Sequence, residues 1–290
     1  MDPSAFIHHF VAPASMCVLM FGMGLTLSPE DFRRLFVQPR PSLLGMALQL
    51  LVMPLLGLAL VLVFRPDPWL AAGVMIAAAL PGGVLSNMVT HLGRLDTPLS
   101  ITLSCLATAV TIFTIPFWIQ AGLQLLGGSS DEIALPLIDT ALDLAAFTLL
   151  PVALGMLARH WKPELVEKEL WFTRLGALVL IIALWIDGQN DLMPAASQFA
   201  SAFWPTFLLT TGALILGLAC GRLARLTWRQ TTTLALELFV KNSVLGLYVS
   251  VQALQSLEAS VPIIILSGLQ IPFFLVLLGI YHLFLKKRDS

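Results

Sequence analysis

The sequence has few charged side chains. Of its 290 residues, 11% are Asp, Glu, Lys or Arg and 58% are hydrophobic, whereas a soluble domain carries about 25% charged residues. The 16 basic and 17 acidic residues nearly balance, and the longest basic tract is the last Lys-Lys-Arg. The sequence therefore has no basic patch of the kind that binds nucleic acid. These shortages exclude a soluble enzyme, a disordered chain and a nucleic-acid-binding protein.

Cysteine and histidine are also scarce. Cys17, Cys105 and Cys220 are scattered through apolar runs without the spacing of a disulfide framework or a metal site. The five histidines show no ligand spacing, and no Ser–His–acid pattern is visible. We therefore expect no disulfide, no catalytic centre and no enzymatic activity.

Apolar runs long enough to cross a membrane are abundant. A transmembrane helix needs about 20 apolar residues, and such runs recur with charges confined to the gaps. We expect an all-α integral membrane protein with nine transmembrane helices and no separate soluble domain. The first run is kept as a span because no Lys or Arg precedes it, as one would in a cleavable signal peptide. The expected spans are approximately 7–27, 41–64, 69–93, 97–126, 133–158, 170–188, 202–221, 230–253 and 261–285.

The basic residues indicate the orientation. With nine spans, 14 of the 16 Lys and Arg residues fall on one side of the membrane and only Arg65 falls on the other. The positive-inside rule then predicts a multi-pass protein of the cell inner (plasma) membrane, with its N-terminus outside and its C-terminus in the cytoplasm. The remaining basic residue, Lys241, lies near the middle of the eighth span.

Polar residues interrupt the third span. Pro81-Gly82-Gly83 removes a backbone donor and adds two flexible positions, and Ser86 and Asn87 follow. Two interpretations are open. One is a proline kink whose freed carbonyls bond to polar side chains; the other is a broken helix whose ends and side-chain oxygens hold an ion or a substrate.

The fourth and second spans add further polar groups. On the fourth span a polar stripe is expected to line an interior, because its members share one helix face. The second span contains Gln49, which is typical of an interhelical hydrogen bond. The stripe consists of Ser100, Ser104, Thr108 and Thr111.

The eighth span carries two charges. Glu237 and Lys241 are four residues apart, and Asn242 follows. A charge at the bilayer centre costs about 3 kcal/mol by insertion scales, so such groups are usually functional. A purely structural ion pair is one interpretation. Because an apolar pair would be less costly there, we favour a mechanistic use.

The two halves of the chain are expected to be inverted repeats. Spans one to four and spans six to nine each have a polar break in their third member, and span five between them reverses the orientation of the second half.

Four stretches resemble the bile acid/sodium symporter family, and its bacterial members with nine spans in particular. They are FGMGLTLSPEDFRRL (21–35), LQLLVMPLLGLAL (48–60), LPGGVLSNMVTHLGRLDTPLSITLS (80–104) and LELFVKNSVLGL (236–247). The resemblance implies one transmembrane transporter domain in two parts. A panel would comprise about 7–27, 133–158 and 170–188. A core would comprise about 41–126 and 202–285, where broken spans three and eight cross.

The resemblance also implies where sodium binds. One site would consist of Ser86, Asn87, Ser100, Ser104 and Glu237. The family's second site would use Gln49, Glu237, backbone carbonyls near Leu238 and Val240, and a glutamine at position 241, where this chain has Lys241. An ammonium cannot coordinate sodium. We therefore predict that Lys241 is a built-in cation that pairs with Glu237 and Gln49, leaving one bound sodium ion or none.

The substrate is expected to be a small organic anion. By resemblance Asn242 touches substrate, and Lys241 could bind its carboxylate. Val84 stands where bile acid carriers tend to have Thr, and Gln270 lies in the last span, where they have a Trp-His-Asn motif. The loss of those groups makes a bile acid a poor candidate.

The favoured function is a secondary-active transporter that works by alternating access and is coupled to sodium. Two alternatives stay open: a proton-coupled or sodium-independent carrier or exchanger that uses Glu237 and Lys241, and a membrane receptor that does not transport. The expected partners are the anion and the lipid bilayer; no nucleic acid and no obligate protein partner are expected.

Overall fold

The computed structural model describes residues 10–28, 30, 33, 37–126, 137–188 and 196–280. These residues form helices joined by short connections, and no named β-strand occurs among them. Within the same residues, four helices are long and apolar enough to cross a membrane: Pro39–Phe64, Thr97–Leu125, Leu142–Trp161 and Ala196–Leu223. The protein is therefore all-helical with membrane-length helices, and the nine-span topology stays a prediction.

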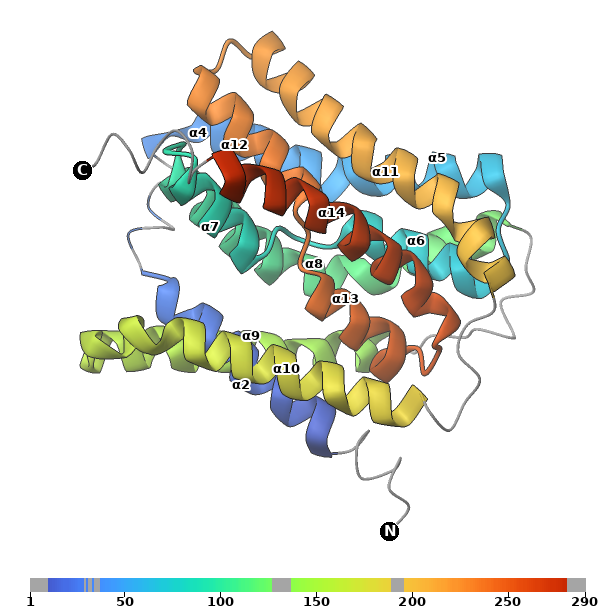
Figure 1. Ribbon diagram of the computed structural model, residues 1–290, viewed down its shortest axis with the longest axis horizontal. Helices are drawn as coiled ribbons and strands as arrows, with labels where there is room; N and C mark the ends of the chain where they lie inside the picture. Colours follow the sequence, from blue (N-terminus) through green and yellow to red (C-terminus); the bar gives the residue numbers. More distant parts are fainter. Residues whose placement is uncertain are drawn as a thin grey trace.

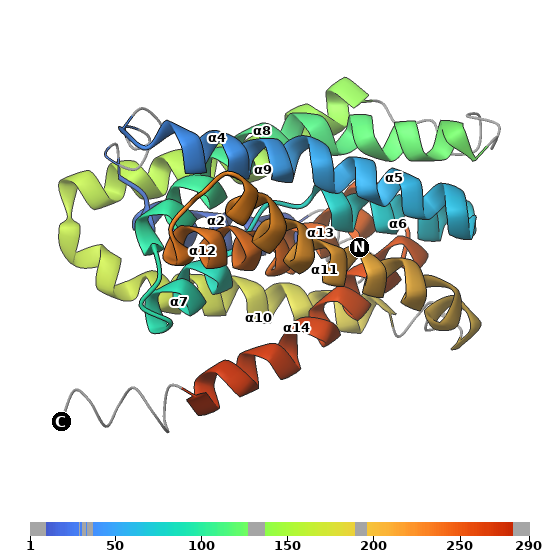
Figure 2. The same cartoon turned by 90° about the horizontal axis from the view of Figure 1, so that it is seen from above.

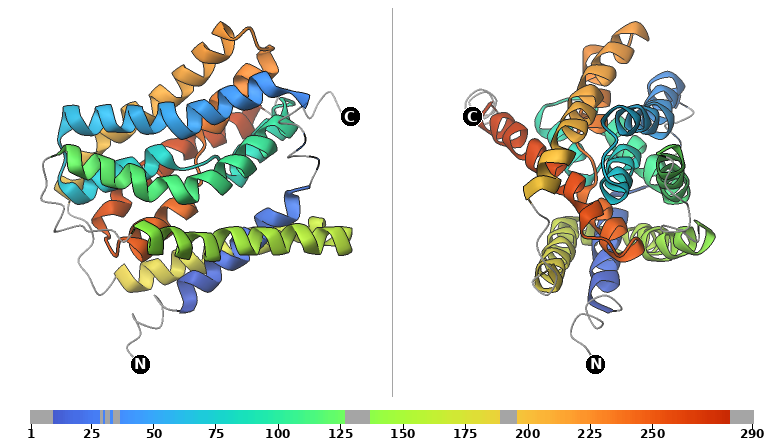
Figure 3. Two further views of the ribbon diagram at one scale, coloured as in Figure 1. Left: turned by 180° about the vertical axis from the view of Figure 1, so that it is seen from behind. Right: turned by 90° about the vertical axis from the view of Figure 1, so that its right-hand side faces the viewer.

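Three helices form a layer on one side of the molecule. Helix α2 (Ala12–Thr26) packs along both α9 (Leu137–Trp161) and α10 (Glu169–Gly188), and the 3₁₀ segment η3 (Pro163–Lys168) joins α9 to α10. Figure 1 shows this α2–α9–α10 layer below the other helices, and the right-hand view of Figure 3 shows the three helices end-on. They correspond to the three spans that the resemblance assigns to a panel.

Glycines bring the backbones of this layer together. A Cβ atom on Gly24 of α2 would overlap the Val152 carbonyl of α9, and one on Gly155 would overlap the Phe21 carbonyl. On the other side of α2, Gly176 of α10 lies directly against its backbone. At the end of the layer, Arg159 Nη1 donates a 2.5 Å hydrogen bond to the Thr26 carbonyl. The layer is thus held by close backbone approach.

The remaining helices form the larger part of the fold. The long members α4–α5, α8 and α11 run lengthwise along the molecule (Figure 2). Proline occupies the first turn of α4, α6 and α8, where its missing N–H costs no hydrogen bond. Their bounds are α4 (Pro39–Ala47), the π-helical turn η2 (Leu48–Val52), α5 (Met53–Phe64), α6 (Pro68–Ala79), α7 (Val84–Leu92), α8 (Thr97–Leu125), α11 (Ala196–Leu223), α12 (Trp228–Phe239), α13 (Ser243–Tyr248), η4 (Val249–Ala253), η5 (Glu258–Ser260) and α14 (Val261–Ile280).

Candidate functional site

Two non-helical segments cross in the interior. Residues 80–83 separate α6 from α7, and residues 240–242 separate α12 from α13; we call these the crossing segments. Gly82 and Lys241 form an isolated antiparallel β-bridge, and Asn242 N–H donates to the Pro81 carbonyl at 2.9 Å. Paired with each other, the segments satisfy buried backbone groups that the helix breaks release. The third span is therefore two helices rather than one kinked helix.

Gly82 lies directly against Glu237. A Cβ atom at position 82 would overlap the Glu237 carboxylate, so only glycine allows this approach. The Gly82 N–H donates to Gln49 Oε1 at 3.4 Å. The first crossing segment is thereby fixed between the helix that carries Gln49 and the helix that carries Glu237.

Three serines surround the Glu237 carboxylate, which is 0% exposed. Ser86 Oγ and Ser100 Oγ each donate to Glu237 Oε2 at 2.7 Å, and Ser104 Oγ donates to Oε1. Ser86 comes from α7 and the other two from α8, one turn apart. Helical spacing of four residues therefore directs Ser100 and Ser104 to the same carboxylate.

Asn87 completes this oxygen cluster. Its Oδ1 lies 2.8 Å from Ser100 Oγ and 3.4 Å from Ser104 Oγ. All five residues that the resemblance assigns to a sodium site are thus brought together by α7, α8 and α12. Sequence separations of 133 to 151 residues between Glu237 and the serines show that the cluster exists only in the folded chain.

The oxygens of this cluster outnumber the protons between them. The three serine hydroxyls take part in six oxygen–oxygen contacts: three with Glu237, two with Asn87 Oδ1 and one with the Gly83 carbonyl. Each hydroxyl carries a single proton to donate. With the Asn87 oxygen facing the serines, the contacts therefore exceed the available protons. An added positive charge stabilises such a cluster.

Lys241 is buried beside the cluster and is 3% exposed. Its Nζ donates to the Leu80 carbonyl at 2.7 Å. Leu80 follows the last residue of α6, so the ammonium lies at the negative end of the α6 dipole. The hydrogen bond thus goes to Leu80 and not to Glu237 or Gln49, the partners predicted from the sequence. The charge of Glu237 still acts on the ammonium electrostatically.

Gln49 bonds to the first crossing segment and not, as its position predicted, to another helix. The side chain is 1% exposed and lies on the π-helical turn η2, where its Oε1 meets the Gly82 N–H. Its Nε2 has no hydrogen-bond partner among the residues that the structure describes. Turns of this kind frequently occur at functional sites.

The four residues predicted to bind substrate differ in their surroundings. Asn242 Oδ1 accepts from Leu245 N–H at 3.1 Å and caps α13, which leaves its Nδ2 group as a donor. Gln270 on α14 is 3% exposed, and its Nε2 donates to the Phe239 carbonyl at 3.0 Å. Lys241 is bonded to Leu80 as described. The Val84 side chain lies outside the part of the chain that the structure describes.

The polar stripe of α8 divides in two. Ser100 and Ser104 reach Glu237, whereas Thr108 donates to the Ser104 carbonyl at 2.7 Å and Thr111 to the Thr108 carbonyl at 3.3 Å. All four residues are buried, as an interior lining requires, but only the two serines reach the carboxylate, and the two threonines bond to the backbone of their own helix. Thr90 does the same toward the Asn87 carbonyl.

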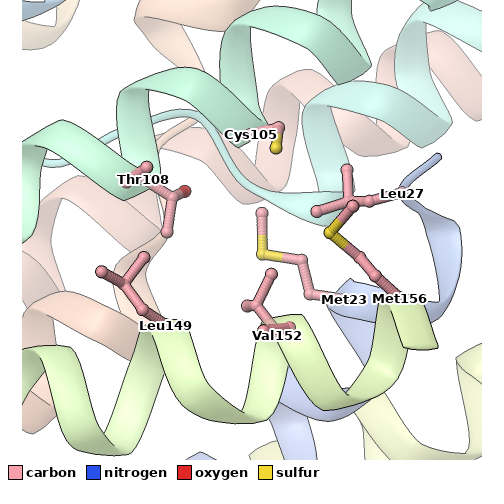
Figure 4. A pocket seen from close by; sticks show the side chains of 9 residues that line it. Met23, Leu27, Cys105, Thr108, Leu149, Val152 and Met156 are labelled. Atoms are coloured by element: carbon pink, nitrogen blue, oxygen red, sulfur yellow. The ribbon is translucent and has the colours of Figure 1, made fainter. Parts of the chain in front are cut away.

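An apolar cavity of about 220 Å³ lies where α8 faces the α2–α9–α10 layer. Figure 4 shows Cys105 and Thr108 of α8 on one side and Leu149, Val152 and Met156 of α9 on the other. None of the four predicted substrate residues lines it. The cavity can accommodate an apolar group but offers no charge to an anion.

Two further contacts were not predicted. Thr233 Oγ1, on α12, accepts from Asp96 N–H at 3.1 Å, and Asp96 in turn caps α8, so this contact positions the start of the helix that carries Ser100. The Gln270–Phe239 contact is the second. Its only signal in the sequence was an amide inside an apolar span.

The fold defines a class: an all-helical membrane protein whose two broken helices cross beside a buried carboxylate. The family model described as "Sodium Bile acid symporter family" matches residues 13–193. The chain belongs to the sodium bile acid symporter family, whose members are transporters and not enzymes.

Three relatives illustrate the match. The rice (Oryza sativa subsp. japonica) protein named "Probable sodium/metabolite cotransporter BASS2, chloroplastic" is 29% identical over 233 residues, which cover 79% of this chain and 53% of the rice protein. The "Uncharacterized sodium-dependent transporter YocS" of Bacillus subtilis (strain 168) is 25% identical over 79% of this chain and 70% of its own length. The "Ileal sodium/bile acid cotransporter" of Oryctolagus cuniculus is 26% identical over 95% of this chain and 80% of its own length. This chain thus spans about half the length of the rice relative.

Proposed function

We propose that this protein is a sodium-coupled secondary-active transporter of a small organic anion. The observation that carries the proposal is the buried cluster of Glu237, Ser86, Ser100, Ser104 and Asn87, which combines one negative charge with neutral oxygens. The names of the relatives, which are sodium cotransporters and a sodium-dependent transporter, agree with it.

Sodium fits the chemistry of this cluster. Hard cations prefer oxygen ligands, and one carboxylate neutralises one monovalent charge. Among the described residues, no three His, Cys, Asp or Glu side chains gather into a metal-binding group. A single carboxylate with hydroxyl and amide oxygens therefore suits a monovalent ion better than zinc or another transition metal.

Lys241 takes the place of a second sodium ion in this proposal. Its ammonium is buried, bonds to the Leu80 carbonyl at the end of α6 and is attracted by Glu237. In relatives that use a glutamine at this position a mobile cation would supply that charge. When Lys241 is protonated the chain itself supplies that charge, so one sodium ion accompanies each anion. Transport of a monovalent anion is then electroneutral.

The anion is proposed to bind at the crossing segments. Asn242 Nδ2 is the proposed donor there, because the Lys241 ammonium already bonds to the Leu80 carbonyl and supplies the second positive charge. The apolar cavity between α8 and the α2–α9–α10 layer is available to a nonpolar part of the substrate. Drug-sized ligands occupy pockets of about 300–1,000 Å³, and the cavity of about 220 Å³ is smaller. A nonpolar part that fits this cavity would be small, which agrees with the proposed small anion.

Alternating access would move the core (about 41–126 and 202–285) against the α2–α9–α10 panel. Panel helices pack mainly with one another and meet the rest of the chain through α8 and α13, which favours relative motion. The proposal includes nine spans in inverted repeats, a location in the cell inner (plasma) membrane, an outside N-terminus and a cytoplasmic C-terminus.

A proton-coupled carrier is the second candidate. Glu237 and Lys241 are both buried and titratable, and one additional proton on the Glu237 cluster would supply the positive charge that its oxygens lack. The cluster could thus exchange a proton in place of sodium.

Uptake into proteoliposomes tests the proposal. Sodium and proton gradients are imposed separately, and the probes are labelled short carboxylates with one bile acid for comparison. We expect a sodium gradient alone to drive accumulation of a short carboxylate. Accumulation under a proton gradient alone supports the second candidate. If the anion equilibrates across the membrane without either gradient, the protein is a uniporter. If no anion moves under any condition, the receptor alternative is supported.

A further inference from the structure

Gln270 contacts the C-terminal end of α12, the helix that carries Glu237. Helix α12 ends at Phe239, two residues after Glu237, and Val240 N–H makes the last helical hydrogen bond, to Leu236. The carbonyls of a final turn have no helical donors. Gln270 Nε2 supplies a donor to one of them, the Phe239 carbonyl, at 3.0 Å.

The environment makes this hydrogen bond consequential. Gln270 is 3% exposed and Phe239 is 8% exposed, so water does not readily replace the amide. A buried carbonyl without a hydrogen-bond donor destabilises the folded protein much more than one that water can reach. The Phe239 ring also packs on Phe273 of α14, with 4.8 Å between ring centroids. Helix α14 thus holds the end of α12 through two side chains one turn apart.

The C-terminal ends of α6 and α12 are capped in a similar manner. The carbonyl that follows α6 accepts from the Lys241 ammonium, and the last carbonyl of α12 accepts from the Gln270 amide. Each C-terminal end beside the crossing is therefore met by a donor from another part of the chain. The donor at α12 is neutral and lies on the side of α12 that meets α14.

We propose that Gln270 is a positioning residue for the sodium site and does not contact the substrate. By capping Phe239 it keeps the last turn of α12 intact, and this turn directs the Glu237 carboxylate toward Ser86, Ser100 and Ser104. One N–H of the amide is used in this bond, and the side chain is enclosed by protein. This inference rests on the proposed sodium site at Glu237.

Sodium titration of the purified full-length protein tests it. Thermal stability is measured against sodium at constant ionic strength, with choline as the replacement. Gln270→Met keeps the length of the side chain but removes the donor. We expect it to raise the sodium midpoint about tenfold, the effect of one lost buried hydrogen bond whose acceptor stays unmet. Gln270→Asn, a shorter amide, should give an intermediate midpoint.

The control is Gln252→Met, because within the described part of the chain the Nε2 of Gln252 has no hydrogen-bond partner. The sodium midpoint of this variant should equal that of the wild type. If Gln270→Met and Gln270→Asn keep the wild-type midpoint while Glu237→Gln abolishes the sodium response, the positioning role is wrong and the sodium site stands. If Glu237→Gln keeps the response, the proposed sodium site itself is wrong. If Gln270→Met does not fold, the midpoint of Gln270→Asn decides.

Discussion

The α2–α9–α10 layer and the crossing segments are stabilised by opposite means. In the layer, Gly24, Gly155 and Gly176 allow helix backbones to touch. At the crossing, Gly82 allows a backbone to approach a buried carboxylate. The serines, Lys241 and Gln270 donate hydrogen bonds there, and Gln49 accepts one from the Gly82 N–H. Close apolar packing favours a rigid body. A buried polar network responds to a single added or lost charge, so the ion response is expected at the crossing.

The largest effect is expected from removing a carboxylate. Glu237→Gln keeps the shape but removes the charge, and sodium-driven uptake should fall about a hundredfold or more, because a buried cation without its counter-charge is strongly disfavoured. The matched control in the layer is Glu169→Gln. Glu169 is also buried, but its partner is Thr173 Oγ1 on the same helix, at 3.0 Å, and uptake should be unchanged. Equal losses in both variants would contradict the comparison.

Adding one methyl group to each region should have different effects: at the crossing it should change the sodium response, and in the layer it should change stability. Gly82→Ala pushes against the Glu237 carboxylate and should remove the sodium response of a protein that still folds. Gly24→Ala pushes against the Val152 carbonyl and should lower stability by about 1–3 kcal/mol while leaving the sodium response intact. Thermal unfolding with and without sodium measures both. The reverse pattern would be evidence against the assigned roles.

A smaller effect is expected along α8. Ser104→Ala removes a donor to Glu237 and should raise the sodium midpoint about tenfold. Thr108→Val removes a hydroxyl that bonds only to the Ser104 carbonyl of its own helix, and we expect no change. Sodium titration of uptake compares the two; a shift caused by Thr108→Val would show that the threonines of the stripe also contribute to the ion site.

The smallest change in rate is expected for Lys241→Gln, which alters coupling instead. Without the ammonium, a second sodium ion has room near the Leu80 carbonyl and Glu237. The Hill coefficient for sodium should rise from one toward two, and uptake of a monovalent anion should become sensitive to membrane potential. An unchanged coefficient would show that Lys241 does not replace an ion.

The sequence predicted the positions of the helices well because their causes are local. Apolar runs, prolines in first turns and the Pro81-Gly82-Gly83 break are each visible within a few residues. The five residues of the Glu237 cluster were also predicted, but only through resemblance. Nothing in their spacing joins Ser86 to a carboxylate 151 residues away.

What the sequence could not predict depends on competition among partners in three dimensions. Lys241 had Glu237 four residues before it, yet its ammonium bonds to Leu80, 161 residues earlier, because the crossing places the end of α6 beside it. Thr108 shares a face with Ser104 but bonds to its own backbone. The bond from Gln270 to the Phe239 carbonyl, 31 residues earlier, likewise has no local cause in the sequence. In each case the nearest acceptor in the fold decides.

Equilibrium binding of radioactive sodium to the purified protein tests the central claim most directly. The account predicts one sodium ion bound per chain for the wild type, none for Glu237→Gln, and unchanged binding for Glu169→Gln. Equal sodium binding by the wild type and Glu237→Gln, or two ions bound per wild-type chain, would contradict a single ion held by Glu237 with Lys241 as the second charge.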